Sequence, residues 1–132
     1  MLQAKDIMTK EVVFVLPETS VKEALELMLA NGISGVPVVQ RDMKLIGVVT
    51  EKDLLRLFSE PGSIGKKSIK EFMTQPVVHF DENENFEDIC QCLNTVHFRR
   101  VPVTKNDKLV GIVSRPDVIR YILSIDDQKV NA

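Results

Sequence analysis

The sequence predicts an α+β protein built from two similar halves, each with the element order β-α-β-β-α. Three stretches of the first half recur in the same order in the second half, at offsets of 65, 65 and 64 residues. The matching pairs are residues 6–15 with 71–80, 34–39 with 99–104, and 46–56 with 110–120. A repeat at a nearly fixed offset indicates a duplicated supersecondary unit. The shorter third offset indicates that the second half lacks one residue in a polar turn, where chain length changes easily.

Strands are predicted at two places in each half. Residues 11–17 and 76–80 are short and rich in Val and Phe, which favours extended structure. Residues 35–50 and 101–114 each contain two apolar runs separated by a polar turn, which is typical of a pair of strands.

A helix follows the first strand of each half. The helix predicted over 20–32 has Ser20 and Glu23 in a capping-box arrangement and ends at Gly32. Its counterpart over 85–97 opens with a similar polar spacing.

The last helix of each half is predicted over 51–58 and 115–125. In the second of these, apolar residues cover about 200° of the helix circumference, more than packing on one sheet requires. The residues of this arc are Val118, Ile119, Tyr121, Ile122, Leu123 and Ile125. The arc predicts packing against the partner repeat or a second copy of the chain, and we expect a homodimer.

Composition excludes several classes of function. The chain has 132 residues, 44% hydrophobic residues, 27% charged residues and a net charge of −2, which is typical of a globular domain. This balance predicts neither a nucleic-acid surface nor a membrane-binding patch. We find no apolar run of membrane-spanning length and no signal-peptide core, and we expect a cytoplasmic protein.

The two cysteines predict neither a disulfide nor a metal centre. Cys90 and Cys92 are one residue apart in a predicted helix, so they point to different faces. A metal site would need more ligands than the nearby His97 supplies. We expect small core residues in a reducing compartment, with no metal bound.

The duplicated motifs resemble tandem cystathionine β-synthase (CBS) domains. The resemblance rests on "DIMT" and "EFMT", "GVPVV" and "RVPVT", and a glycine-containing strand that ends in Ser/Thr-x-x-Asp. It covers about residues 5–125. It implies a first CBS repeat at 1–60, a linker at 61–69, a second repeat at 70–126 and a tail at 127–132.

The resemblance also implies an architecture and a function. Two CBS repeats form a Bateman module, whose sheets pack against each other around a pseudo-twofold axis. The two clefts between the repeats often bind AMP, ADP or ATP, and sometimes S-adenosylmethionine. Such modules commonly act as regulatory sensors and commonly dimerise. They need no cofactor, and the nucleotide is a regulatory ligand.

Two aspartates are candidate ribose ligands. Thr50 and Ser114 each end a predicted strand and precede a helix, with Asp53 and Asp117 three residues later. This spacing is already a good helix-capping arrangement without any ligand. The family resemblance implies instead that the aspartate holds the ribose diol and that the Ser or Thr contacts phosphate.

The resemblance implies further contacts with phosphate and adenine. The phosphate-binding candidates are Thr50, Lys52, Ser114, His97, Arg99 and Arg100. The adenine-contacting candidates are Val12, Val13, Ile33, Ser34, Val77, Val78 and Phe98. The plain alternative for Arg99 and Arg100 is solvated charge at a strand end. Two adjacent arginines beside a predicted helix start favour phosphate binding instead, because arginine forks bind phosphate oxygens through paired hydrogen bonds.

We expect each cleft to mix the two repeats. One would combine Val12, Val13, Ile33 and Ser34 with Ser114, Asp117 and the arginine pair, and the other would combine Val77, Val78, Phe98 and Arg99 with Thr50, Lys52 and Asp53. The arginine pair predicts that the cleft with Asp117 binds anionic nucleotides more strongly. Pro116 weakens this expectation, because proline has no N–H where the family often offers a hydroxyl.

Other functions are less well supported by the sequence. We find no phosphate-binding loop, nucleophile elbow or metal-ligand cluster. His79 lies on a predicted strand, where a single histidine is more often packed or exposed than catalytic, and His97 lacks an evident acid–base partner, so catalysis is not expected. A ligand-free interaction scaffold and an S-adenosylmethionine sensor remain alternatives. The effector protein is unknown.

Overall fold

The chain forms two units, and the segment that begins each sequence repeat belongs to the unit that contains the rest of the other repeat. We call these the exchanged segments. The computed structural model describes residues 2–59, 62–95 and 99–130. Unit 1 joins residues 1–12 to residues 78–132, and unit 2 contains residues 13–77. The packing units therefore divide the chain differently from the two sequence repeats.

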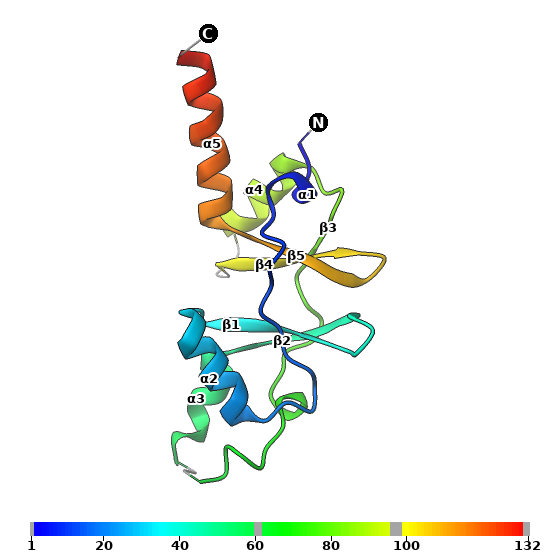
Figure 1. Cartoon of the computed structure of the whole chain (residues 1–132), viewed down its shortest axis with the longest axis vertical. Coiled ribbons are helices and arrows are strands. Elements are labelled where there is room, and N and C mark those ends of the chain that lie inside the picture. The colour runs from blue at the N-terminus through cyan, green and yellow to red at the C-terminus, as the bar shows by residue number, and fades with distance from the viewer. Residues whose placement is uncertain (1, 60–61, 96–98, 131–132) are drawn as a thin grey trace. The chain divides into compact units, whose positions relative to one another are not determined.

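Unit 1 contains a three-stranded sheet and three helices (Figure 1). Its elements are α1 (Ala4–Ile7), β3 (Phe80–Asp81), α4 (Phe86–Thr95), β4 (Arg100–Lys105), β5 (Lys108–Ser114) and α5 (Arg115–Val130). Strand β4 lies in the middle, parallel to β3 and antiparallel to β5. Helix α1 packs against α5 and β5. The core of the unit consists of Ala4, Phe80, Ile89, Leu93, Val101, Val103, Val113 and Val118.

Unit 2 is built around a two-stranded antiparallel sheet. Its elements are α2 (Val21–Asn31), β1 (Gly35–Val39), β2 (Leu45–Thr50), α3 (Glu51–Leu55) and the 3-10 turns η1 (Arg56–Ser59) and η2 (Ile69–Glu71). Helix α2 packs against β1 and α3. The core consists of Val15, Val21, Ala24, Met28, Val36, Val38, Val49, Leu54, Leu57 and Ile69. The α+β class predicted from the sequence is confirmed.

Equivalent contacts hold the exchanged segments, residues 4–9 and 69–74, against a strand of the unit in which each lies. Thr9 pairs with Ile112 of β5 in unit 1, and Thr74 pairs with Val48 of β2 in unit 2. A glycine on each strand makes room for the methionine of the docked segment. A Cβ on Gly111 would collide with Met8, and one on Gly47 would lie 2.8 Å from Sδ of Met73.

The hairpins and helix caps agree with the sequence. Asn106 (φ 52°) and Asp107 (φ 67°) form a tight two-residue turn between β4 and β5, which accounts for the missing residue of the second half. The backbone N–H of Glu23 donates to Ser20 Oγ at 3.1 Å, and α2 ends at Gly32 with φ 61°. The predicted end of the second helix, residues 96–97, lies outside the described residues.

The first predicted strands are wrong in most of their length. Over residues 11–17 only Val15 pairs, in a single parallel bridge with Val38. Pro17 follows at once, and Thr19 N–H closes a turn onto Leu16, so the ladder cannot continue. Over residues 76–80 only Phe80 is in a strand, where it pairs in parallel with Val103 of β4.

The linker predicted between the halves is bonded to unit 2. Val21 N–H donates to Lys67 O at 2.9 Å, and Lys22 N–H donates to Ile64 O at 3.1 Å. Ile69 is fully buried in the core of this unit. In the part of the chain that the structure describes, no helix has the length and apolar character needed to cross a membrane.

Candidate functional site

The first candidate corner is the junction of β2 and α3 in unit 2. Oδ2 of Asp53 accepts hydrogen bonds from Thr50 N–H at 2.8 Å and from Thr50 Oγ1 at 3.0 Å. The N–H of Asp53 donates back to Thr50 Oγ1 at 3.4 Å. The arrangement is a capping box, and Asp53 is half-buried.

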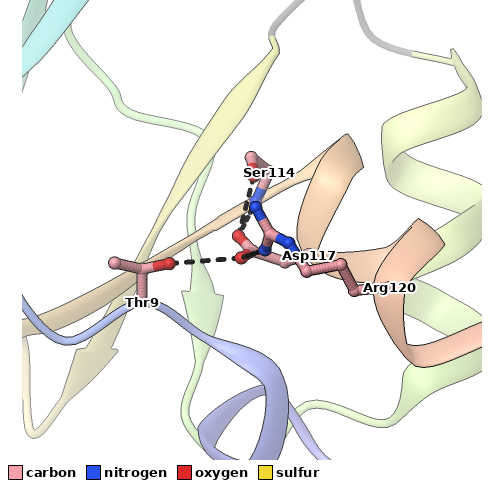
Figure 2. A network of polar contacts seen from close by, with 4 residues as sticks. All are labelled: Thr9, Ser114, Asp117 and Arg120. Carbon is pink, nitrogen blue, oxygen red and sulfur yellow. Dashed lines mark hydrogen bonds and ion pairs between the residues drawn. The ribbon is translucent and has the colours of Figure 1, made fainter. Parts of the chain in front are cut away.

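The second candidate corner is the junction of β5 and α5 in unit 1 (Figure 2). Oδ2 of Asp117 accepts from Ser114 N–H and from Ser114 Oγ, both at 2.7 Å. Oδ1 accepts from Thr9 Oγ1 at 3.1 Å and from Arg120 Nη1 at 2.9 Å. The side chain of Asp117 is only 5% exposed. Both aspartates thus bond the start of their own helix, as the capping interpretation predicts.

A backbone bond joins each corner to the segment before the hairpin of the same unit. The N–H of Glu51 donates to Ser34 O at 2.8 Å, and the N–H of Arg115 donates to Arg99 O at 3.4 Å. Ser34 therefore lies beside the corner of Asp53, and Arg99 lies beside the corner of Asp117.

The described phosphate candidates are accessible to solvent. Lys52, Arg99 and Arg100 are exposed, whereas Thr50 and Ser114 are half-buried. Arg100 is the direct cross-strand partner of Ser114, so the two side chains emerge on the same face of the sheet. Two arginines thus flank the start of α5, a 16-residue helix whose positive dipole end favours anions. His97 lies outside the described residues.

The adenine candidates are divided between the two units. Val12 and Val78 belong to unit 1, whereas Val13, Ile33, Ser34 and Val77 belong to unit 2. Ser34 and Val78 are exposed, and the other four are half-buried. Phe98 lies outside the described residues. The shared clefts in which these residues would meet stay a prediction.

The cysteines show no feature of a reactive or metal-binding site. Cys90 and Cys92 are free thiols that are partly packed against the core of unit 1. Burial raises the pKa of both thiols above the ordinary value, so both are protonated near neutral pH. Among the described residues, no group of three or more His, Cys, Asp or Glu side chains could hold a metal ion.

Two residues of the second corner were missed in the sequence analysis. Thr9 and Arg120 both bond Asp117, and Arg120 forms an ion pair with it at 2.9 Å. A signal existed, because Thr9 recurs as Thr74 and Arg120 recurs as Arg56. Repetition alone, however, does not show which side chain a residue contacts.

The chain is similar to several known proteins. The CBS domain family matches residues 4–60 and 69–124. The chloroplastic CBS domain-containing protein CBSX1 of Arabidopsis thaliana is 35% identical, over 84% of this chain and 59% of its own length. The CBS domain-containing protein YhcV of Bacillus subtilis is 31% identical, over 89% of this chain and 84% of its own length. This chain thus spans less than two thirds of the first relative and most of the second.

The fold matches that of CBS-pair structures with bound ligands. CBSX2 of Arabidopsis thaliana, solved in complex with AMP, has a TM-score of 0.82 and 34% identity, covering 94% of this chain and 98% of its own. The CBS domain pair of protein MJ0100, solved with 5′-methylthioadenosine and S-adenosyl-L-methionine, has a TM-score of 0.76 and 27% identity, covering 93% and 97%. Two family matches that together span most of the sequence, with these structural likenesses, show that the chain belongs to the CBS-domain family as a tandem CBS pair.

Proposed function

We propose that this chain is a non-enzymatic regulatory module that binds an adenosine-containing ligand of the AMP, ADP and ATP class between its repeats. The carrying observation is the Ser/Thr-x-x-Asp corner, formed in both units of a chain that is 34% identical to a CBS pair solved with AMP. A carboxylate can accept hydrogen bonds from both hydroxyls of a ribose diol. The exposed Arg99 and Arg100 beside the start of α5 offer charge for phosphate.

The proposed mechanism is a population shift. The nucleotide contacts both repeats and favours one arrangement of the module or of its dimer. A separate effector protein then responds to that arrangement, so that the module senses the energy state of the cell. Free thiols favour a reducing compartment, and we assign the protein to the cytoplasm.

We expect adenine nucleotides to raise the thermal stability of the protein. A ligand present at 100 times its dissociation constant contributes about 2.7 kcal/mol, which raises Tm by several degrees in a chain of this size. The measurement is a thermal shift with AMP, ADP, ATP and S-adenosylmethionine, with GMP as the matched control for the base. A shift with S-adenosylmethionine alone would favour the alternative of an S-adenosylmethionine sensor. This is one of the ligands with which the CBS pair of MJ0100 was solved. No shift with any ligand would favour an interaction scaffold.

The scaffold alternative and the proposed homodimer both rest on the outer face of α5. Val118 is buried and Tyr121 packs edge-on against Phe86, with ring centroids 5.1 Å apart. The other side of the helix leaves three large apolar side chains in solvent: Ile119 at 55%, Ile122 at 49% and Leu123 at 59% exposed. Burial of such side chains in a second copy would contribute about 1.5–3 kcal/mol each at most.

We expect the chain to be a dimer at tens of micromolar and Leu123→Glu to shift it toward the monomer. A charge in an apolar interface loses its hydration without gaining a partner. Light scattering coupled to size exclusion measures the mass, and Ser124→Glu, at the neighbouring exposed position, is the matched control. A wild-type monomer would rule out the dimer at this concentration.

A further inference from the structure

The two corners have the same residue types but different contacts. Each corner has a hydroxyl residue, an aspartate three residues later and an arginine three residues after that. These residues are Thr50, Asp53 and Arg56 in unit 2, and Ser114, Asp117 and Arg120 in unit 1. The docked segment adds Thr74 to unit 2, and the equivalent segment adds Thr9 to unit 1.

The carboxylate of Asp117 has no acceptor capacity left. A carboxylate offers about four lone-pair positions, two on each oxygen. Ser114 occupies Oδ2 with two hydrogen bonds, and Thr9 and Arg120 each occupy Oδ1 with one. Figure 2 shows these three residues converging on the carboxylate from separate parts of unit 1. We call this arrangement the Asp117 lock.

Toward the residues that the structure describes, the carboxylate of Asp53 keeps one oxygen available. Thr50 occupies Oδ2 with two hydrogen bonds, as Ser114 does in unit 1. Among the described residues, none donates a hydrogen bond to Oδ1 of Asp53. Arg56, the counterpart of Arg120, lies instead over the ring of Phe72, with its Cζ 4.8 Å from the ring centroid.

Two differences separate the arginines. Arg56 lies in the 3-10 turn η1, whereas Arg120 lies within the helix α5, and the docked segments differ at one position. Phe72 occupies the position of the docked segment that Ile7 occupies in unit 1, 65 residues earlier. An aromatic face attracts a guanidinium group, whereas an aliphatic side chain offers it no electrostatic partner. Arg56 is therefore held on the ring, while Arg120 reaches its aspartate.

We propose that Phe72 keeps the Asp53 carboxylate open for the vicinal hydroxyls of a nucleoside, and that the Asp117 lock closes the equivalent carboxylate. The inference rests on the proposed function and adds an order of occupation. A ribose diol can use the two free positions on Oδ1 of Asp53, whereas at Asp117 it must first displace Thr9 or Arg120. The corner of Asp53 fills first, in contrast to the ranking that the arginine pair predicts. Phe72 is a positioning residue that acts through Arg56.

The test is a calorimetric titration of the full chain with AMP. We expect Asp53→Asn to weaken the first AMP by about tenfold or more, since it loses charge-assisted hydrogen bonds. Phe72→Ile should weaken it by about threefold or more, because Arg56 becomes free to pair with Asp53. Adding Arg56→Gln to Phe72→Ile should restore wild-type affinity, and Phe72→Tyr should preserve it. This rescue separates the positioning role from simple damage to the fold.

The second corner provides the opposite test. Arg120→Gln removes one donor from the Asp117 lock without touching the first corner, and it should tighten the second AMP by about threefold or more. Arg41→Gln, an exposed arginine elsewhere in unit 2, is the matched control and should leave both binding steps unchanged. The ligand 2′,3′-dideoxyadenosine monophosphate lacks both ribose hydroxyls. It should therefore bind more weakly than AMP, by the part of the affinity that depends on Asp53.

The failures of the two proposals are distinguishable. No binding of AMP, ADP or ATP to the wild type or to any variant overturns the proposed function, and the order of occupation with it. Binding to the wild type that is insensitive to Asp53→Asn, or that Phe72→Ile leaves unchanged, overturns the inference alone. A loss of affinity in Phe72→Ile that Arg56→Gln does not restore also overturns the role of Phe72.

Discussion

Replacing Ile69 with alanine is expected to lower the free energy of unfolding by about 2–5 kcal/mol, the usual range for a fully buried isoleucine. Ile69 has no exposed surface and lies in the core of unit 2, although it belongs to the segment that leads into the second sequence repeat. Truncation removes apolar contacts and leaves a cavity. Equilibrium unfolding in urea, followed by circular dichroism, measures the loss.

The neighbouring residue is the matched control for this prediction. Lys70 is exposed in the same turn, and Lys70→Ala should change stability by no more than about 0.5 kcal/mol. Equal and small effects of the two substitutions would show that η2 is not docked in unit 2. The exchange of leading segments would then be wrong.

Replacing Asp117 with alanine is expected to lower the free energy of unfolding by about 2–3 kcal/mol, because several donors lose one buried acceptor. The substitution leaves the hydroxyl of Thr9 and the N–H of Ser114 without their partner. Arg120 contributes less to this loss, since its own side chain is 71% exposed and screened by water. Urea unfolding again measures the effect.

The equivalent substitution in unit 2 is the control for this prediction. Among the described residues, Asp53 bonds only its own helix start, so Asp53→Ala should cost about 1 kcal/mol, as the loss of a helix cap does. An Asp117→Ala loss no larger than that of Asp53→Ala would show that Thr9 and Arg120 add nothing to the cap. The Asp117 lock would then have no energetic basis.

Local features of the fold could be predicted well from the sequence. Ser20 and Gly32 bound α2 as their types predict, since a cap depends on residues within one turn. The hairpin turn at Asn106 and Asp107 follows in the same way from residues that tolerate positive φ. The capping role of Asp53 and Asp117 was also visible in the three-residue spacing.

The first strands could not be predicted in the same way. Val12 to Val15 have strand composition, but a strand needs a partner with free backbone groups. Val15 finds one in Val38, and the turn at Pro17 then removes the chain from the sheet. Residue composition indicates how well a segment suits a β-sheet, but it does not indicate how many residues find a partner strand.

The repeat, the helix caps, the hairpins and the pair of aspartates follow from the amino-acid sequence, because each depends on neighbours a few residues away or on self-similarity. Two features came only from the folded chain. One is the exchange that docks residues 4–9 in unit 1 and residues 69–74 in unit 2. The other is the partner of each arginine, Asp117 for Arg120 and Phe72 for Arg56. Both depend on side chains brought together from distant parts of the chain, and no local pattern encodes which of several equivalent partners lies within reach.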